Sequence, residues 1–177
     1  SAIVRRLVGS EMCIRDRLEM SHRSKFLVIV DDSIELSVAI RFAAQRAKNT
    51  KGGIILLNII EQFDPQQWQS VEEIIRQEAT DKAQEKLQKW SKVIHDLVDI
   101  VPEVRIKEGI PSEKIIETLE SDDAIRFLVL AAADADQPGP LVTLLAGQKS
   151  GKLPVPIVVI PQGLEDDVID DLASRAN

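Results

Sequence analysis

From Lys25 onward the chain alternates nearly continuous apolar runs with amphipathic stretches. The runs are rich in β-branched residues, which is typical of strands that are buried on both faces. They cover residues 26–30, 54–60, 104–107, 127–132 and 157–160. Connections of a few residues join the runs to helical stretches, and this alternation favours a parallel sheet wound by right-handed crossovers. The pattern therefore predicts an α/β domain built on one sheet.

Two of the predicted helices carry clear sequence signals. Asp32 and Glu35 stand three positions apart, as in a capping box, so Asp32 is predicted to begin the first helix. The apolar positions of that helix are Ile34, Val38, Phe42 and Ala43. A much longer helix between Pro65 and Pro102 is predicted to lie across the sheet, because its apolar residues recur every three or four positions. That stripe consists of Val71, Ile74, Ile75, Ala79, Ala83, Leu87, Trp90, Ile94 and Leu97.

The chain divides into three segments. Residues 1–19 have no periodicity and contain four arginines without a lysine, so we interpret them as a non-native or disordered extension ahead of Met20. Residues 20–162 form the predicted domain. Residues 163–177 form an acidic helix or tail, which is expected to dock on the sheet or on a partner subunit, with a solvated tail as the alternative. In the docked case, deleting the residues after Gln162 weakens dimerisation, which sedimentation would detect.

The composition and charge of the chain limit the cellular compartment and the classes of binding partner that can be expected. The formal charge of −7 gives a field that repels nucleic-acid backbones and anionic lipid surfaces. No apolar run reaches the roughly 20 residues that span a bilayer. The single cysteine, Cys13, cannot form an internal disulfide, and the two histidines lie far apart without metal-ligand spacing. These features predict a cytoplasmic protein that has no metal site and binds neither nucleic acid nor a membrane.

Candidate binding residues follow the predicted strands. In an open parallel sheet a ligand lies beyond the carboxyl ends of the strands, where the strand order changes direction. Asp31 and Asp32 lie at the end of the first strand, Asn58 and Ile59 at the end of the second, and Pro161 at the end of the fifth. The longest loop, 134–140, follows the fourth strand. An acidic residue at such a point either accepts hydrogen bonds from a ligand or holds a metal, unless, as Asp32 could, it only caps the next helix. Long loops at strand ends commonly carry function.

The order of several segments resembles the universal stress proteins. These are VIVDDS at 28–33, ILLNII at 55–60, KEGIPSEKIIE at 107–117, FLVLAA at 127–132, LLAG at 144–147 and LPVPIVVIP at 153–161. The resemblance covers most of the chain. It implies an open five-stranded parallel sheet of order 3-2-1-4-5 with helices on both faces, the adenine nucleotide hydrolase-like fold. It also implies a homodimer, often paired through the last strand, and in many members a site for ATP or AMP.

Carried over by position, the resemblance matches the family's adenine-contacting acid to Asp31 and the residue whose backbone meets the base to Ile59. Nucleotide-binding members then show Gly-x-x-Gly after the fourth strand and, nine residues later, Gly followed by Ser or Thr. This chain departs from that motif. Ala131 and Asp134 replace the two glycines, and Gly147-Gln148 replaces the final pair after about three extra loop residues, among which Gly139 is a substitute candidate.

The departure has a physical meaning. Glycine lets backbone N–H groups approach phosphate oxygens, and a hydroxyl adds a donor. A carboxylate such as that of Asp134, placed about 4 Å from a phosphate charge, costs about 4 kcal/mol at an effective dielectric near 20. The motif therefore predicts a degenerate phosphate site.

Three hypotheses follow. The first is a cytoplasmic, homodimeric universal stress protein that regulates protein partners, has no certain cofactor and is not an enzyme. The second is a member that binds ATP or AMP with magnesium through Asp31, Ile59, Gly139 and Gly147, as a slow ATPase or a nucleotide switch. The third is a phospho-switch like a response-regulator receiver, suggested by the paired acids Asp31 and Asp32, although the aspartate that receivers phosphorylate is missing.

Overall fold

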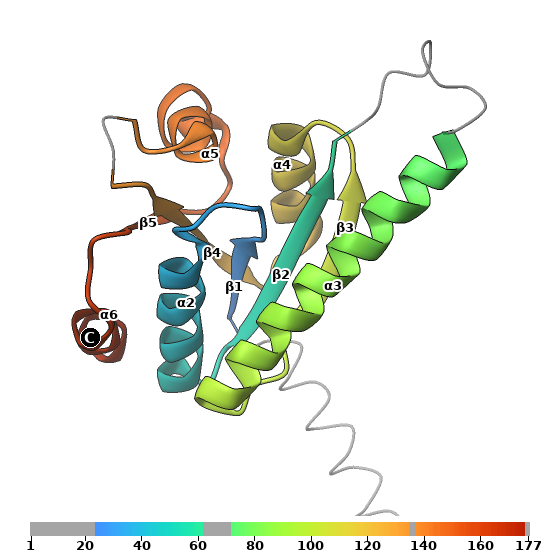
Figure 1. Ribbon diagram of the computed structural model, residues 1–177. Coiled ribbons are helices and arrows are strands. Elements are labelled where there is room, and N and C mark those ends of the chain that lie inside the picture. The colour runs from blue at the N-terminus through green and yellow to red at the C-terminus, as the bar shows by residue number, and fades with distance from the viewer. Residues whose placement is uncertain (1–23, 62–71, 135–136, 176–177) are drawn as a thin grey trace, which may run out of the picture.

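The computed structural model describes residues 24–61, 72–134 and 137–175 of the 177-residue chain, and Figure 1 shows the arrangement of their elements. The strands are β1 (Lys25–Ile29), β2 (Gly53–Ile60), β3 (Glu103–Glu108), β4 (Ile125–Ala132) and β5 (Ile157–Pro161). The α-helices are α2 (Leu36–Thr50), α3 (Glu72–Val98), α4 (Pro111–Ser121), α5 (Pro140–Val142) and α6 (Asp166–Ser174). Between α5 and β5 lie a π-helical turn, η1 (Thr143–Gln148), and a 3-10 turn, η2 (Ser150–Lys152).

All strand pairs are parallel, and the strand order is β3-β2-β1-β4-β5. This confirms the predicted α/β class and strand order. The central strand is β1, in which Val28 pairs with Leu56 of β2 on one side and with Val129 of β4 on the other. Because both faces of β1 are covered, its buried apolar run needs no polar alternation.

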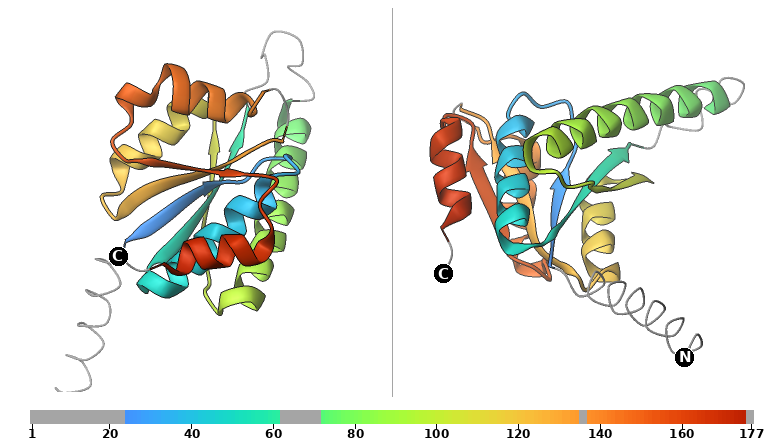
Figure 2. Two further views of the ribbon diagram at one scale, coloured as in Figure 1. Left: turned by 90° about the vertical axis from the view of Figure 1, so that its left-hand side faces the viewer. Right: turned by 90° about the horizontal axis from the view of Figure 1, so that it is seen from below.

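Helices cover both faces of the sheet (Figure 2). Phe26, Val28 and Val30 pack with residues of α2, α3 and α6, whereas Leu27 and Ile29 pack with residues of α4, α5 and η1. The division follows from the pleat, which turns successive side chains of a strand to opposite faces. None of the helices in the described ranges is long and apolar enough to cross a membrane.

The prediction that Asp32 caps the first helix is wrong. Helix α2 begins at Leu36, four residues later, and its N-cap position is Glu35, whose side chain makes no capping hydrogen bond. The Asp32 carboxylate instead forms an ion pair with Lys86 of α3 at 2.6 Å. Ile34, predicted as a core position of the helix, lies before it and is 82% exposed. A turn centred on Asp31 takes up the intervening residues, because Oδ1 of Asp31 accepts hydrogen bonds from the amide and hydroxyl of Ser33.

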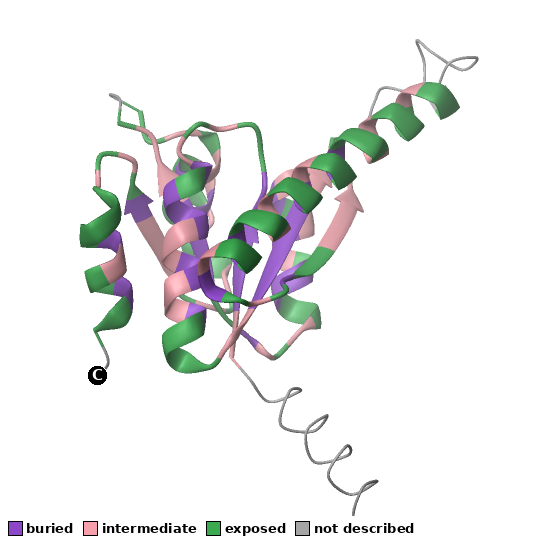
Figure 3. Cartoon of the chain, turned by 60° about the horizontal axis from the view of Figure 1, so that its bottom comes forward, coloured by how far each residue is buried: buried purple, intermediate pink, exposed green. Residues whose placement is uncertain are grey.

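The long helix α3 is confirmed, but only part of its apolar stripe is buried. Ala83, Leu87 and Ile94 are at most 2% exposed, whereas Ile74 is 60% exposed. Val71 lies outside the described residues. The first turns of α3 extend beyond the ends of β2 and β3 (Figure 3), so no sheet surface is available to cover their apolar side.

The C-terminal helix α6 packs on α2 of the same chain. Ile169 and Ala173 are fully buried there, so the solvated-tail alternative is wrong. Arg41 of α2 pairs with Asp166 at 2.9 Å and with Asp170 at 2.7 Å. The hydrogen bond from Arg41 lowers the pKa of Asp170 below its usual value. The helix therefore belongs to the core of the fold.

Charges at the amino ends of the strands are compensated by one another. Lys25 lies 2.9 Å from Glu103 and 3.2 Å from Asp122, and Arg105 contacts both acids. Partial burial acts to raise the pKa of Asp122, but hydrogen bonds from Arg105, the Ala124 amide and Lys25 outweigh it and hold that pKa below its usual value. Charged residues at the carboxyl end of β1 instead line pockets.

Candidate ligand-binding site

The strand order creates a crevice at the carboxyl end of β1. The helix that follows β1 packs on one face of the sheet, and the helix that follows β4 packs on the other. Ligands of open α/β sheets bind at such a switch point. Two adjoining pockets lie at this point, and the residues common to both are Ile29, Asp31, Asp32, Pro140 and Leu141.

The larger pocket lies between the ends of β1 and β2 and the helices α3 and α4, and we call it the β2-side pocket. Its volume is about 570 Å³. Much of its wall is aliphatic, including Ile29, Val30, Ile59, Ile60, Ile110, Leu141 and Leu144. Asp31, Asn58 and Ser112 add polar groups, and Lys82 and Lys86 of α3 stand along one side. An apolar cavity with a few polar groups suits a small organic ligand.

Asn58 holds the two central strands together at the floor of this pocket. Its side chain is 6% exposed, and its Nδ2 donates a hydrogen bond of 2.6 Å to the Val30 carbonyl. The Val30 amide donates in turn to the Leu57 carbonyl at 2.8 Å. These bonds fix the backbone immediately before Asp31. The sequence placed Asn58 at the end of the second predicted strand, where a ligand was expected, but no binding role was assigned to it.

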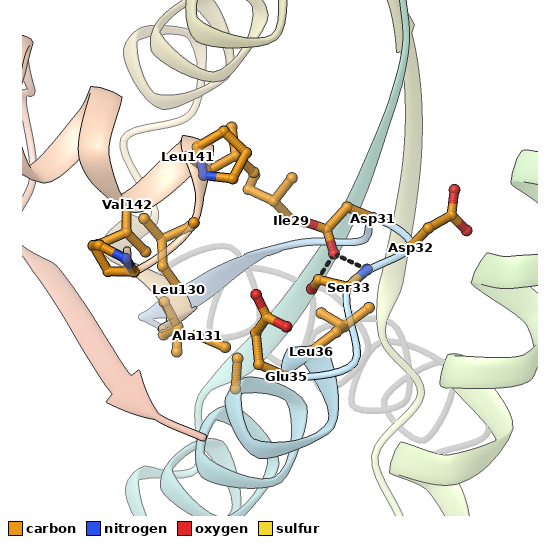
Figure 4. Close-up of a pocket in the computed structure, with 15 residues that line it drawn as sticks. Ile29, Asp31, Asp32, Ser33, Glu35, Leu36, Leu130, Ala131, Leu141 and Val142 are labelled. Carbon is orange, nitrogen blue, oxygen red and sulfur yellow. Dashed lines mark hydrogen bonds between the residues drawn. The ribbon is translucent and has the colours of Figure 1, made fainter. Parts of the chain in front are cut away.

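The smaller pocket lies between the ends of β1 and β4, and we call it the β4-side pocket. Its volume is about 260 Å³, and Asp31, Asp32 and Glu35 are the charged residues that line it. Figure 4 shows the Glu35 carboxylate turned toward the space beside Ala131, whereas the Asp32 carboxylate points away. No lysine or arginine is among its described lining residues. The pocket is therefore acidic.

Glu35 also stands beside the single glycine of the β4-side pocket. Gly139 has a φ of +96°, and a Cβ placed on it would lie 3.6 Å from Oε1 of Glu35. Glu35 is half-buried and has no ion-pair partner among the described residues. The glycine that could bring backbone close to a ligand therefore faces a carboxylate.

Residues 22–143 match the model of the universal stress protein family. The chain belongs to this family. No curated protein matches the chain. Among solved structures, the universal stress protein UspA of Lactobacillus plantarum is 16% identical, with a TM-score of 0.65 over 78% of this chain and 98% of that one. A family member from Burkholderia pseudomallei is 15% identical, with a TM-score of 0.60 over 80% and 98% of the two chains.

Two similar structures were solved with a nucleotide, one with cAMP and one with dAMP. The universal stress protein of Archaeoglobus fulgidus in complex with dAMP is 16% identical, with a TM-score of 0.53 over 78% of this chain and 98% of that one. At these sequence identities the solved structures establish the fold alone. What the site can bind depends on the residues of this chain.

The structure brings together four of the six site residues expected for a universal stress protein ligand. Asp31 lines both pockets, Ile59 lines the β2-side pocket, and Ala131 and Gly139 line the β4-side pocket. The expected final pair, Gly147 and Gln148, lies outside both pockets. Both residues are exposed within η1, where a Cβ on Gly147 would meet nothing within 4 Å. Residues 140–148 form α5 and this π-helical turn.

Asp134 is not the carboxylate that faces the β4-side pocket. Its amide donates to Oε1 of Gln162 at 3.1 Å, and its own Oδ2 lies 3.8 Å from the Cβ position of Gly163, beyond β5. Asp134 lines neither pocket. The negative charge expected from Asp134 is supplied by Glu35 instead. Glu35 was interpreted from sequence only as a capping residue, and nothing in its spacing indicated contact with the loop after β4.

Proposed function

We propose that this universal stress protein is a regulatory binding module for protein partners that neither retains nor hydrolyses nucleoside triphosphates. The observation that carries the proposal is the acidic lining of the β4-side pocket. Family resemblance assigns the phosphates to this side of the crevice. Asp31 and Glu35 face the space, and none of its described lining residues is a lysine or arginine.

Electrostatics oppose a triphosphate in that position. A carboxylate about 4 Å from a phosphate charge costs about 4 kcal/mol at an effective dielectric near 20. Phosphoryl transfer also needs cationic groups that stabilise charge on the transferred phosphate. Within the described ranges, no three His, Cys, Asp or Glu side chains are grouped as metal ligands.

A second candidate function is a nucleotide switch that binds AMP or ATP. The β2-side pocket favours it, because Asp31 and Ile59 both line that pocket and its aliphatic wall suits a flat base. Universal stress proteins have been solved in complex with cAMP and with dAMP. The two candidates differ in what the phosphate end of the crevice tolerates.

The first experiment is mass spectrometry of small molecules released from the freshly purified full chain, followed by calorimetric titration with ATP and magnesium. We expect no released nucleotide and no heat of binding up to millimolar ATP, because the β4-side pocket repels the phosphates. Released ATP or AMP, or ATP binding at micromolar concentration, would contradict the proposal and favour the nucleotide switch.

A homodimer through β5 is part of the proposal. β5 is an edge strand of the sheet, with half-buried Ile157, Val158 and Val159. The following helix α6, which packs on α2, exposes Val168 and Leu172. Edge strands with apolar side chains pair readily with another chain. We expect the full chain to sediment at twice its mass of 19.7 kDa. The double variant V168E/L172E, which keeps the buried contacts of α6, should shift the species toward monomer, and a monomeric parent chain would refute the dimer.

A further inference from the structure

The crevice joins two chemically different spaces through Asp31. The β2-side pocket is large and mostly aliphatic, with Asp31 and Asn58 as polar groups near the strand ends. The β4-side pocket is smaller and offers a carboxylate, Glu35, beside the backbone of Gly139. A ligand that spans both spaces would place a flat apolar part on one side of Asp31 and a polar part on the other.

The polar part must be compatible with Glu35. A carboxylate accepts hydrogen bonds and repels anions, and Glu35 has no cation beside it among the described residues. Hydroxyl groups satisfy such an acceptor, whereas a phosphate brings a second negative charge next to it. Half-burial strengthens both effects, since screening by water is weaker there than on the open surface.

We propose that Glu35 selects the ligand by rejecting phosphate, and that the crevice takes an uncharged nucleoside. The base lies in the β2-side pocket with its amino hydrogens toward Asp31, and the sugar hydroxyls meet Glu35. The inference rests on the proposed function, because both depend on the acidic β4-side pocket excluding phosphate. It adds that Glu35 sets the order of affinities. The nucleoside binds more tightly than its monophosphate, and the triphosphate binds least tightly.

The test is calorimetric titration of the full chain with adenosine, AMP and MgATP, repeated on Glu35→Gln. For the parent chain we expect adenosine to bind at least about tenfold more tightly than AMP, with no detectable binding of ATP. Glutamine keeps the size of the side chain and removes its charge. Glu35→Gln should therefore raise the affinity for AMP about tenfold and narrow the gap between adenosine and AMP.

Glu120→Gln is the matched control, because Glu120 is an exposed residue of α4 that lines neither pocket, and its substitution changes the net charge equally. The control should leave all three affinities unchanged. If Glu35→Gln leaves the affinity for AMP unchanged while the parent chain ignores ATP, the role of Glu35 is overturned and the proposed function stands. Absence of adenosine binding at millimolar concentration would overturn the nucleoside as ligand. Micromolar binding of ATP by the parent chain would overturn the proposed function itself.

Discussion

Replacing Ile169 with alanine should lower the free energy of unfolding by about 3 kcal/mol. Ile169 lies on α6, close to the C-terminus of the chain, yet it is fully buried in the same core cluster as Val28 of the central strand. Truncating it removes apolar contacts and leaves a cavity between α6 and α2, and both effects reduce stability. Urea denaturation followed by circular dichroism would measure the change in midpoint.

Val168→Ala is the matched control for this prediction. Val168 precedes Ile169 on the same helix but is 41% exposed, so its truncation should change stability by no more than about 0.5 kcal/mol. If both variants unfold at the same urea concentration as the parent chain, α6 does not form part of the folded core. A loss confined to Ile169→Ala would support the packing of α6 on α2.

Replacing Asn58 with alanine should cost about 2 kcal/mol, because the buried Val30 carbonyl loses its side-chain donor. The same change should weaken ligand binding, since the Asn58 bond to Val30 positions the backbone that leads into Asp31. Thermal denaturation would measure the first effect, and calorimetric titration with adenosine would measure the second.

Asn49→Ala removes an equivalent amide at an exposed position. Asn49 makes a long contact of 3.5 Å with the Ala173 carbonyl, so its loss should have a small effect on stability and none on binding. If Asn58→Ala is as stable as the Asn49 variant, the hydrogen bond to Val30 does not hold the strand ends together.

Local, repeated signals were sufficient to predict the α/β class and its elements, whereas the strand order followed from the family resemblance. Strands such as β1 are continuous apolar runs, and the buried part of α3 keeps a strict helical period. The sequence pattern could not show whether either of two neighbouring carboxylates caps the first helix. Asp31 and Asp32 both precede a helix, but α2 begins four residues after Asp32, which instead pairs with Lys86, 54 residues away.

The candidate site was harder to predict for a related reason. Asp31, Ile59, Ala131 and Gly139 follow strand ends, and the topology brings strand ends together whatever the loops do. Glu35 lies directly before α2, but its proximity to Gly139 depends on where the chain after β4 places that glycine. The family motif gave no guide to this placement or to that of Asp134, because of the extra residues. Gly147 was misjudged as a pocket residue for the same reason, since a π-helical turn carries it into solvent.

The first turns of α3, which extend beyond the sheet, are expected to be less stable than the rest of that helix. Tertiary packing, rather than intrinsic propensity, stabilises most helices in proteins. The turns around Ile74 lack that packing, whereas those around Ile94 have it. Opening of the outer turns therefore requires far less free energy than global unfolding. Ala79 and Lys82, which line the β2-side pocket, lie at the border between the two regimes. Amide hydrogens on one continuous helix are thus divided into a fast-exchanging and a slow-exchanging set, and the division falls at the wall of the pocket.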